Sequence, residues 1–301
     1  MKQLKIWIEC ARLRTLPVSL SGVVIAIALT WWMGKVQWIP ALLCVVFALL
    51  AQVVSNFANE YFDYLHGADK VGRVGPRRGV TEGDIRPSTL KWVTIVTLIV
   101  DALVGLCLIP YGGWWMLPLG IVIALAAIAY SAGPYPLSYH GLGELAVFIF
   151  FGVVPVILMH YVQTRHFHPF VILTGMAVGF MAVNVLLVNN YRDVDDDREA
   201  GKRTSVVIFG RKPAAAAYLI NGYVAMSLLS PMWILAALGQ GGLQWTLVAP
   251  VIYLILHTVA WFRLTRRDGA ALNPLLGATA RNMLIFTILI TVALILSVRF
   301  I

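Results

Sequence analysis

Apolar runs long enough to cross a lipid bilayer recur along the whole chain and constrain its fold more than any other feature. A helix needs about 20 mostly apolar residues to cross the hydrocarbon core, and its backbone hydrogen bonds must then close within the segment. The runs that meet this length are residues 16–33, 39–58, 91–109, 113–131, 144–162, 169–189, 215–237, 245–262 and 282–299. The sequence therefore predicts an all-α integral membrane protein with nine transmembrane helices.

The distribution of positive charge predicts the orientation of these helices. Hydrophobic residues make up 60% of the chain and charged residues 12%, while the formal net charge is +9. Of the 23 Lys and Arg residues, 20 lie in or beside the N-terminus and the loops at 60–90, 132–143, 190–214 and 263–281. Only Lys35, Arg165 and Arg299 fall opposite. The positive-inside rule then places the N-terminus in the cytoplasm. Topology accounts for the charge, so we expect the lipid bilayer, and no nucleic acid, as a partner.

The acidic residues crowd onto the same side and form a repeated motif. Of 14 Asp and Glu residues, all but Asp101 lie on the side that carries the positive loops. Residues 59–63 and 189–193 share the pattern Asn-x-Tyr-x-Asp at an offset of 130 residues, and Asp69 and Glu199 keep that offset. Each copy ends an apolar run. The repeat therefore places two polar clusters at the same end of two membrane helices.

The spacing within each copy puts oxygen-bearing side chains on one helix face. Residues four apart share a face, which groups Asn59 with Asp63, and Asn189 with Asp193 and Asp197. Carboxylate and amide oxygens without Cys or suitably placed His are a ligand set that suits Mg²⁺. We therefore expect the two faces to hold magnesium between them.

Positive side chains flank both motifs and indicate an anionic substrate. They are Lys70, Arg73, Arg77, Arg78, Lys202 and Arg203. Protein-bound Mg²⁺ usually takes its remaining ligands from water and phosphate oxygens, so carboxylates among cations indicate a metal-bridged diphosphate. The chain has no GxxxxGK[ST] phosphate loop and no nucleophile with an adjacent base. An allylic diphosphate fits best, because its carbon–oxygen bond breaks once the leaving group is neutralised and its lipid tail suits a helix bundle.

Two further features lie outside the motifs. The uncharged segment 130–137 contains Tyr130, Tyr135 and two prolines, and we expect a rigid, partly buried turn with both hydroxyls pointing inward. Tyr130 would steady an allylic cation through its ring face. Asp101 lies near the middle of the third apolar run, where an ionised carboxylate is costly, so we expect it to face protein or to be neutral, and we favour a packed polar contact.

The motifs as a whole resemble those of the UbiA-type intramembrane prenyltransferases. The resemblance is carried by Asn56-x-x-Asn59-Glu60-x-x-Asp63 with Asp69, and by Asn189-Asn190-x-x-Asp193-x-x-x-Asp197. Supporting stretches are residues 12–17 (RLRTLP), 73–77 (RVGPR), 130–137 (YSAGPYPL), 141–144 (GLGE), 201–204 (GKRT) and 272–281 (LNPLLGATAR). They span nearly the whole chain, so a single prenyltransferase domain over 1–301 is expected. The resemblance is greatest to the branch that acts on 1,4-dihydroxy-2-naphthoate in menaquinone synthesis.

The resemblance implies nine helices around a central cavity, capped on the cytoplasmic side by the motif loops. It also implies Mg²⁺-assisted transfer of a polyprenyl chain from its diphosphate to the naphthoate ring with loss of the carboxyl group, in a bacterial inner membrane. Predicted metal ligands are Asn59, Asp63, Asp69, Asn189, Asp193 and Asp197. Predicted substrate-binding residues are Arg14, Asn56, Lys70, Arg73, Arg77, Lys202 and Arg203. Predicted catalytic residues are Asp63, Asp193, Asp197 and Tyr130.

Some assignments stay open at this point. Glu60 stands where the first motif usually has Asp, so its role is undecided, and Arg14 is expected to hold the acceptor's carboxylate. Other acceptors, among them 4-hydroxybenzoate and homogentisate, would use the same motifs. A transporter is the alternative from another class, but it predicts acids near the bilayer midplane and often an inverted repeat. The isoprenoid length, the number of metal ions and the oligomeric state are also open.

Overall fold

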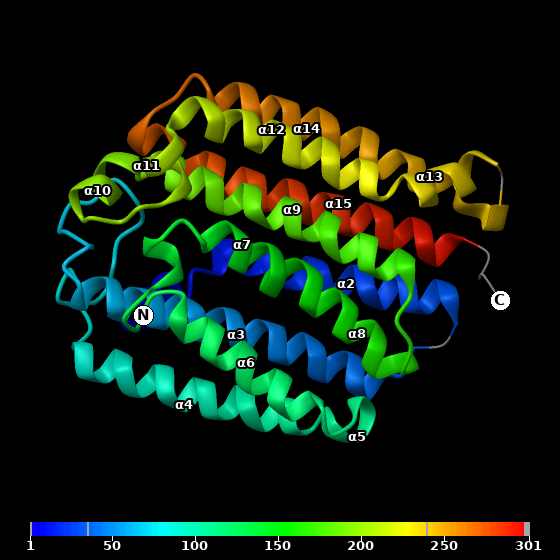
Figure 1. Cartoon of the computed structure of the whole chain (residues 1–301), viewed down its shortest axis with the longest axis horizontal. Coiled ribbons are helices and arrows are strands. Elements are labelled where there is room, and N and C mark those ends of the chain that lie inside the picture. The colour runs from blue at the N-terminus through cyan, green and yellow to red at the C-terminus, as the bar shows by residue number, and fades with distance from the viewer. Residues whose placement is uncertain (1, 35, 239, 298–301) are drawn as a thin grey trace.

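The computed structural model describes residues 2–34, 36–238 and 240–297, which fold into helices without any strand (Figure 1). The helices are α1 (Lys2–Ala11), α2 (Leu16–Met33), α3 (Trp38–Leu65), α4 (Pro87–Leu106), α5 (Ile109–Gly112), α6 (Met116–Ala129), α7 (Gly143–Val147), α8 (Val154–Thr164), α9 (Pro169–Arg192), α10 (Val194–Glu199), α11 (Ser205–Phe209), α12 (Arg211–Leu228), α13 (Ser230–Ala237), α14 (Val248–Leu264) and α15 (Asn273–Leu296). A π-helical segment, Phe148–Val153, joins α7 to α8. The expected all-α class is confirmed.

Each of the nine expected runs overlaps a helix, but the number of membrane crossings is not settled at nine. Among the described residues, seven helical stretches are long and apolar enough to cross a membrane: Leu16–Met33, Trp38–Leu65, Pro87–Gly112, Gly143–Thr164, Pro169–Arg192, Gln244–Leu264 and Gly269–Leu296. An eighth crossing results if α12 and α13, bent by 49° at Leu229, count as one span. The remaining run, 113–131, corresponds to α6, which has only 14 residues.

Several helices have a proline in their first turn, and α11 ends at a glycine. Pro17, Pro87, Pro169 and Pro274 lie in the first turns of α2, α4, α9 and α15, where a missing N–H breaks no intrahelical bond. At the C-terminal end of α11, Gly210 adopts φ +87°, a conformation that suits glycine and separates α11 from α12. Local sequence therefore fixes these helix ends.

Packing is tightest around α9. Sixteen residues of this helix are buried, while α6 has none and α4 has only Leu90 and Asp101. Figure 1 shows α9 among α7, α8, α12 and α15, with α4 and α6 on the opposite side of α3. The bundle thus has a rigid side built on α9 and an outer wall of α4 and α6 that buries little against protein.

Small residues let the π-helical segment lie directly on α9. A Cβ added at Gly152 would fall 2.2 Å from Gly179 Cα, and 2.8 Å from the carbonyl oxygen of Gly175. Close backbone approach at glycines is the usual means of packing membrane helices, because van der Waals contact replaces a hydrophobic driving force. No side chain at position 152 fits without moving α9.

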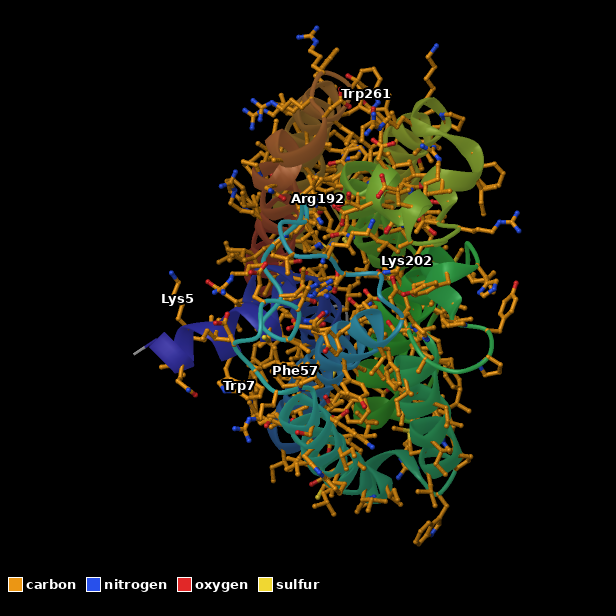
Figure 2. The ribbon with its side chains drawn as sticks, turned by 90° about the vertical axis from the view of Figure 1, so that its left-hand side faces the viewer. Lys5, Trp7, Phe57, Arg192, Lys202 and Trp261 are labelled. Atoms are coloured by element: carbon orange, nitrogen blue, oxygen red, sulfur yellow. The ribbon has the colours of Figure 1, made fainter. Side chains whose placement is uncertain are left out.

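The polar loops and the N-terminus gather at one end of the bundle. Figure 1 shows α10, α11 and the loops after α3, α6 and α14 at the same end, with the C-terminal part of α15 at the other. Figure 2 looks onto this end: Arg192 and Lys202 lie near its centre, and Lys5 points away from the bundle. Trp7 of α1 packs edge-on against Phe57 of α3 with ring centroids 5.9 Å apart. The segments expected on one side of the membrane therefore share one end.

Which side this end faces is a prediction that labelling can test. Val71 in the loop after α3 is 72% exposed, and Phe167 at the opposite end is 60% exposed. In a Cys107→Ser background, which removes the exposed native thiol, we expect Phe167→Cys to react with an impermeant maleimide in intact spheroplasts. Val71→Cys should react only after lysis. The reverse pattern would place the N-terminus outside.

The glycine contact predicts a large stability difference between two similar changes. Gly152→Ala should destabilise the fold by about 1–3 kcal/mol, because its methyl group meets the α9 backbone, which cannot rotate away. Gly120→Ala in α6 should have little effect, since nothing lies within 4 Å of its added Cβ. Thermal unfolding in one detergent measures both, and equal melting temperatures would contradict the close approach.

Candidate functional site

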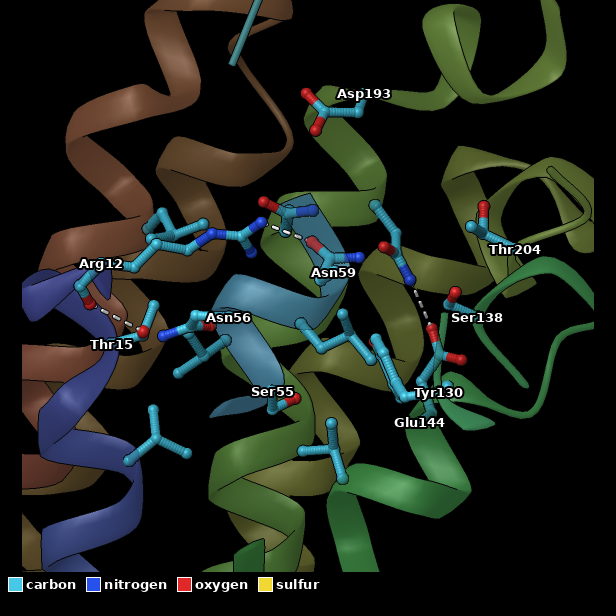
Figure 3. A pocket seen from close by; sticks show the side chains of 18 of the residues that line it. Arg12, Thr15, Ser55, Asn56, Asn59, Tyr130, Ser138, Glu144, Asp193 and Thr204 are labelled. Atoms are coloured by element: carbon cyan, nitrogen blue, oxygen red, sulfur yellow. Dashed lines mark hydrogen bonds between the residues drawn. The ribbon is translucent and has the colours of Figure 1, made fainter. Parts of the chain in front are cut away.

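A polar cavity of about 150 Å³ opens at the loop-bearing end and collects most of the predicted site residues (Figure 3). Its predicted members are Asn56, Asn59, Asp63, Arg73, Tyr130, Asn189, Asp193, Asp197 and Lys202. Arg12, Arg78 and Glu144 also line it. The two copies of the acidic repeat, 130 residues apart in sequence, thus face the same cavity from α3 and from α9–α10.

The α3 side carries a hydrogen-bonded pair of amide and carboxylate. Asn59 Nδ2 donates to Asp63 Oδ2 at 3.1 Å and to Ser131 Oγ at 2.9 Å. Asp63 Oδ2 also pairs with Lys202 Nζ at 2.9 Å, and its Oδ1 accepts from the Tyr139 hydroxyl at 3.0 Å. The predicted (i, i+4) face of Asn59 and Asp63 is therefore present, with both carboxylate oxygens already engaged.

The α9 side holds Asp193 even more firmly. Arg192 Nε donates to Asp193 Oδ1 at 2.6 Å and Nη2 to Oδ2 at 2.7 Å, a two-point grip. Arg73 Nη2 reaches the same Oδ2 at 3.0 Å, and Arg192 Nη2 also donates to Asn189 Oδ1 at 2.9 Å. By contrast, the Asp197 carboxylate lines the cavity with no hydrogen bond or ion pair to any described residue.

Burial raises the pKa of two carboxylates, one in α10 and one in the loop after α3. It raises the pKa of Asp197 to about 7, and the nearby Lys202 offsets only part of this effect. It raises the pKa of Asp69 to about 6, against the opposing charge of Arg73. A buried carboxylate without a matched cation is costly as the anion. A divalent cation beside Asp197 would supply the missing positive charge.

Three of the predicted cations reach the cavity and three do not. Arg73, Arg78 and Lys202 line it. Lys70 instead pairs with Glu199 at 2.9 Å on the surface, and Arg77 pairs with Asp84 at 2.6 Å. The Arg203 side chain is exposed, and only its backbone N–H is held, by the carbonyl of Tyr139 at 3.0 Å. Neighbouring side chains, such as those of Lys202 and Arg203, thus lie in different places, one in the cavity wall and one at the surface.

Two acidic residues of the first motif do not line the cavity, and they contact other parts of the chain instead. Asp69 lies between Arg73 Nη1 at 2.7 Å and Arg78 Nε at 3.0 Å, contacts with ion-pair distances but without hydrogen-bond angles. Glu60 is 1% exposed and accepts from the Val80 N–H at 3.2 Å and from Cys10 Sγ at 3.3 Å. The longer Glu side chain therefore contacts both α1 and the loop after α3.

The carboxylates share a cavity but do not form a ready-made metal cluster. Within the described ranges, no three His, Cys, Asp or Glu side chains are placed to hold one ion. Cations lie between them instead, with Lys202 on Asp63, and Arg73 and Arg192 on Asp193. The donor set of carboxylate and amide oxygens still fits Mg²⁺, with Asp197 as its uncommitted member.

Sequence reasoning missed three residues of the site. Arg12 donates to Asn59 Oδ1 from the turn after α1, where its own backbone is left-handed at φ +53°. Tyr139 binds Asp63 and lies under Lys202 Nζ, 4.8 Å from the ring centroid. Arg192 lies inside the second motif itself, so its position next to Asp193 was the available signal. The side chain of Arg14, the predicted acceptor ligand, lies outside the described part of the structure.

Of the remaining predicted polar residues, Asn56 and Tyr130 line the cavity and Tyr135 does not. Asn56 lines the cavity while its amide donates to the carbonyl of Ala11 at 2.9 Å, which ties α3 to the end of α1. Tyr130 lines the cavity as expected, but the expectation for Tyr135 is wrong. Its side chain is 57% exposed and stacks on His140 at 3.6 Å between ring centroids.

An apolar cavity of about 350 Å³ adjoins the polar one. The two share Ser55, Tyr130 and Phe151, and the larger runs between α3, α4, α6 and α8 toward Leu108 and Met116. Asp101 lines it, buried to 5% exposure, and its Oδ1 has no hydrogen-bond partner in the described chain. The polar contact expected for this oxygen is therefore not found.

The different positions of Lys202 and Arg203 predict different effects on anion binding. Lys202→Gln should weaken binding of inorganic pyrophosphate with Mg²⁺ by about 10-fold to 100-fold, the range for loss of a charged hydrogen bond. Arg203→Gln should change it less than about twofold, because that side chain points to solvent. Isothermal titration with both variants measures this, and equal losses would place the anion elsewhere.

Comparisons with known proteins show which family the chain resembles. The model of the UbiA prenyltransferase family matches residues 19–285. The chain is 34% identical to the 1,4-dihydroxy-2-naphthoate octaprenyltransferase of Escherichia coli (strain K12), over 97% of this chain and 95% of the relative. It is 32% identical to the enzyme of the same name from Mycobacterium tuberculosis, over 96% of each chain.

Solved structures show the same fold at low identity. The UbiA homologue from Archaeoglobus fulgidus bound to DMAPP and Mg²⁺ superposes with a TM-score of 0.63 at 16% identity, covering 95% of this chain and 99% of that one. The apo UbiA homologue from Aeropyrum pernix K1 gives a TM-score of 0.66 at 17% identity, covering 94% and 98%. With a family match over most of its length and full-length relatives above 30% identity, this chain belongs to the UbiA prenyltransferase family.

Proposed function

We propose that this protein transfers a polyprenyl chain from an allylic diphosphate to 1,4-dihydroxy-2-naphthoate, with loss of the carboxyl group, to give demethylmenaquinol, the reduced form of demethylmenaquinone. The observation that carries the proposal is the junction of two cavities: one lined by acids and cations, the other by apolar side chains, meeting at Ser55, Tyr130 and Phe151. Such a pair fits a substrate with a charged head and a hydrocarbon tail. The names of the full-length relatives support the acceptor.

The diphosphate belongs in the polar cavity. Arg73, Arg78 and Lys202 offer guanidinium and ammonium donors there, and such groups bind phosphate oxygens strongly. Each of them now pairs with a carboxylate, so a bound diphosphate would share these cations with Asp63, Asp69 and Asp193. Lys70, Arg77 and Arg203 are not assigned to the diphosphate, because their side chains lie outside the cavity wall.

Magnesium fits the same cavity through its oxygen donors. We assign Asp63, Asp193 and Asp197, with the amide oxygens of Asn59 and Asn189, as the residues that would hold it. The solved UbiA homologue bound to DMAPP and Mg²⁺ supports the use of this ion. When bound, the ion neutralises the departing diphosphate. Asp69 is assigned to orient Arg73 and Arg78, since its carboxylate lies between them rather than at the cavity wall.

The reacting carbon of the allylic chain would lie where the two cavities meet. Tyr130 lines both of them, so its ring can steady positive charge on the allylic carbon by roughly 0.5–2 kcal/mol. The apolar lining excludes water and protects this carbon from hydrolysis. The carbon–oxygen bond breaks toward the diphosphate, and the aromatic ring supplies the electron pair for the new carbon–carbon bond.

The acceptor needs a cation for its carboxylate, and Arg12 is placed to supply it. Its guanidinium enters the polar cavity beside Asn59, in a wall that faces Tyr130 and Glu144 (Figure 3). After attack by the carbon that carries the carboxylate, loss of carbon dioxide returns the electron pair to the ring and restores aromaticity. No ring proton has to leave in this exchange. Arg14 was expected in this role, and Arg12 takes it in the proposal.

Product formation tests the function directly. Purified protein in lipid nanodiscs, given 1,4-dihydroxy-2-naphthoate, octaprenyl diphosphate and Mg²⁺, should release demethylmenaquinol and carbon dioxide, detected by mass spectrometry. A panel with 4-hydroxybenzoate and homogentisate tests the acceptor, and preference for either would replace the naphthoate. Substrate-independent ion flux without any prenyl product would favour the transporter instead.

Two aspartates of one short helix give the matched variants for this assay. Asp197→Asn should lower the rate at least about 100-fold, because it removes the uncommitted carboxylate that faces the cavity. Asp195→Asn should leave the rate nearly unchanged, since its side chain is 70% exposed and binds Arg198 and Arg211 at the surface. Full activity in Asp197→Asn would refute the metal assignment.

A further inference from the structure

We propose that Asn273, the first residue of α15, is a positioning residue that fastens the 66–86 loop onto the acidic cavity. This loop joins α3 to α4 and carries Arg73 and Arg78. Asn273 does not line the cavity, yet its side-chain amide joins two parts of the chain that do: the loop and, through Arg192, the end of α9 that carries the second acidic motif. The effects on KM and kcat that are expected below rest on the proposed function.

The first half of the contact runs through Arg192. This side chain is 1% exposed, and its donors are shared among three acceptors. Two bonds grip Asp193, a third reaches Asn189 Oδ1 at 2.9 Å, and Nη1 donates to Asn273 Oδ1 at 3.1 Å. Because the guanidinium is planar, fixing Nη1 also fixes the plane in which Asp193 and Asn189 are held.

The second half runs from the same amide to the loop. Asn273 Nδ2 donates to the carbonyl of Val74 at 3.0 Å. On its other side, the Val74 N–H donates to Asp196 Oδ2 at 3.4 Å, and the neighbouring Arg73 reaches Asp193. One peptide segment is therefore held from α10, α9 and α15 together, and the arginine that it carries is directed into the cavity.

The next residue of the loop lies flat on Arg192. A Cβ at Gly75 would come within 2.8 Å of Arg192 Nη2 and 3.2 Å of its Cζ. An arginine tip normally moves aside for a methyl group, but this one is fixed by four hydrogen bonds. The glycine lets the loop backbone cover the guanidinium and shields its bonds from water, which strengthens them.

The two bonds of Asn273 can be separated by substitution. Asn273→Asp keeps an oxygen for Arg192 but replaces the donor to Val74 with a second oxygen, so it frees the loop while Arg192 stays held. Asn273→Leu has a similar volume and removes both bonds. The first change should therefore raise KM for the diphosphate with kcat within about twofold. The second should also lower kcat, because Asp193 loses its fixed orientation.

Loop protection gives a readout that needs neither metal nor activity. The Lys70 and Arg77 side chains are 63% and 49% exposed, so trypsin can cut the loop once it opens. In metal-free protein, both variants should speed cleavage at these sites by about threefold to tenfold, the factor expected from one lost hydrogen bond. Mass spectrometry of the fragments locates the cuts. Gly75→Ala should have the same effect by displacing the loop.

A second asparagine of α15 is the matched control. Asn282 is 6% exposed and also donates its amide to a backbone carbonyl, that of Leu256 at 3.2 Å, far from the loop. Asn282→Leu should lower the melting temperature about as much as Asn273→Leu without changing loop cleavage. Unchanged loop cleavage in Asn273→Asp and Gly75→Ala, or equal loop cleavage in Asn282→Leu, would overturn the proposal. Should the wild type form no prenyl product, the function fails while the cleavage result still decides this point.

Discussion

The structure depends on matching buried charges at the end of an apolar bundle. Asp63, Asp69 and Asp193 lie where water is scarce, and each is held by Lys202, Arg73, Arg78 or Arg192 at distances of 2.6 to 3.0 Å. An isolated carboxylate in such a place would cost several kcal/mol, so the cations are needed for folding as well as for binding. The same cations are the natural ligands of a diphosphate. In the proposed function, folding and substrate recognition therefore draw on one set of side chains.

Among the described residues, one aspartate of the cavity lacks the positive partner that the other aspartates there have. Asp197 alone among the cavity carboxylates has no partner in the described chain, and burial disfavours its ionised form. A divalent ion placed there would complete the compensation that the arginines provide elsewhere. In the proposed function, the acidic cavity would thus favour a substrate that arrives with its own cation over a bare anion.

Long-period features of the sequence predicted the fold and the position of the site. The helix runs and the 130-residue repeat depend only on hydrophobicity and on spacing along a helix, so α3 and α9 were placed before their contacts were known. The choice between neighbouring side chains was not predictable. Lys202 enters the cavity, where it pairs with Asp63, and its neighbour Arg203 does not line the cavity. The left-handed backbone of Arg12 likewise directs its side chain inward.

Loop contacts with distant helices were also beyond sequence reasoning. Glu60 binds a backbone N–H 20 residues away, and Asn273 binds one carbonyl 199 residues away. Such contacts follow from tertiary packing, which leaves no local pattern. Asp101 shows the reverse case, since its sequence position indicated a polar partner and the cavity beside it is apolar.

The weakly packed wall of α4 and α6 has a consequence for long isoprenoids. Moving α6 away from α3 would exchange contacts with apolar side chains for contacts with lipid chains of the same polarity, at little cost in hydrophobic free energy. A chain longer than the apolar cavity can then leave sideways between these helices and continue among the surrounding acyl chains. The protein would then contact only the first few isoprene units, and it would not select for the length of the remaining chain.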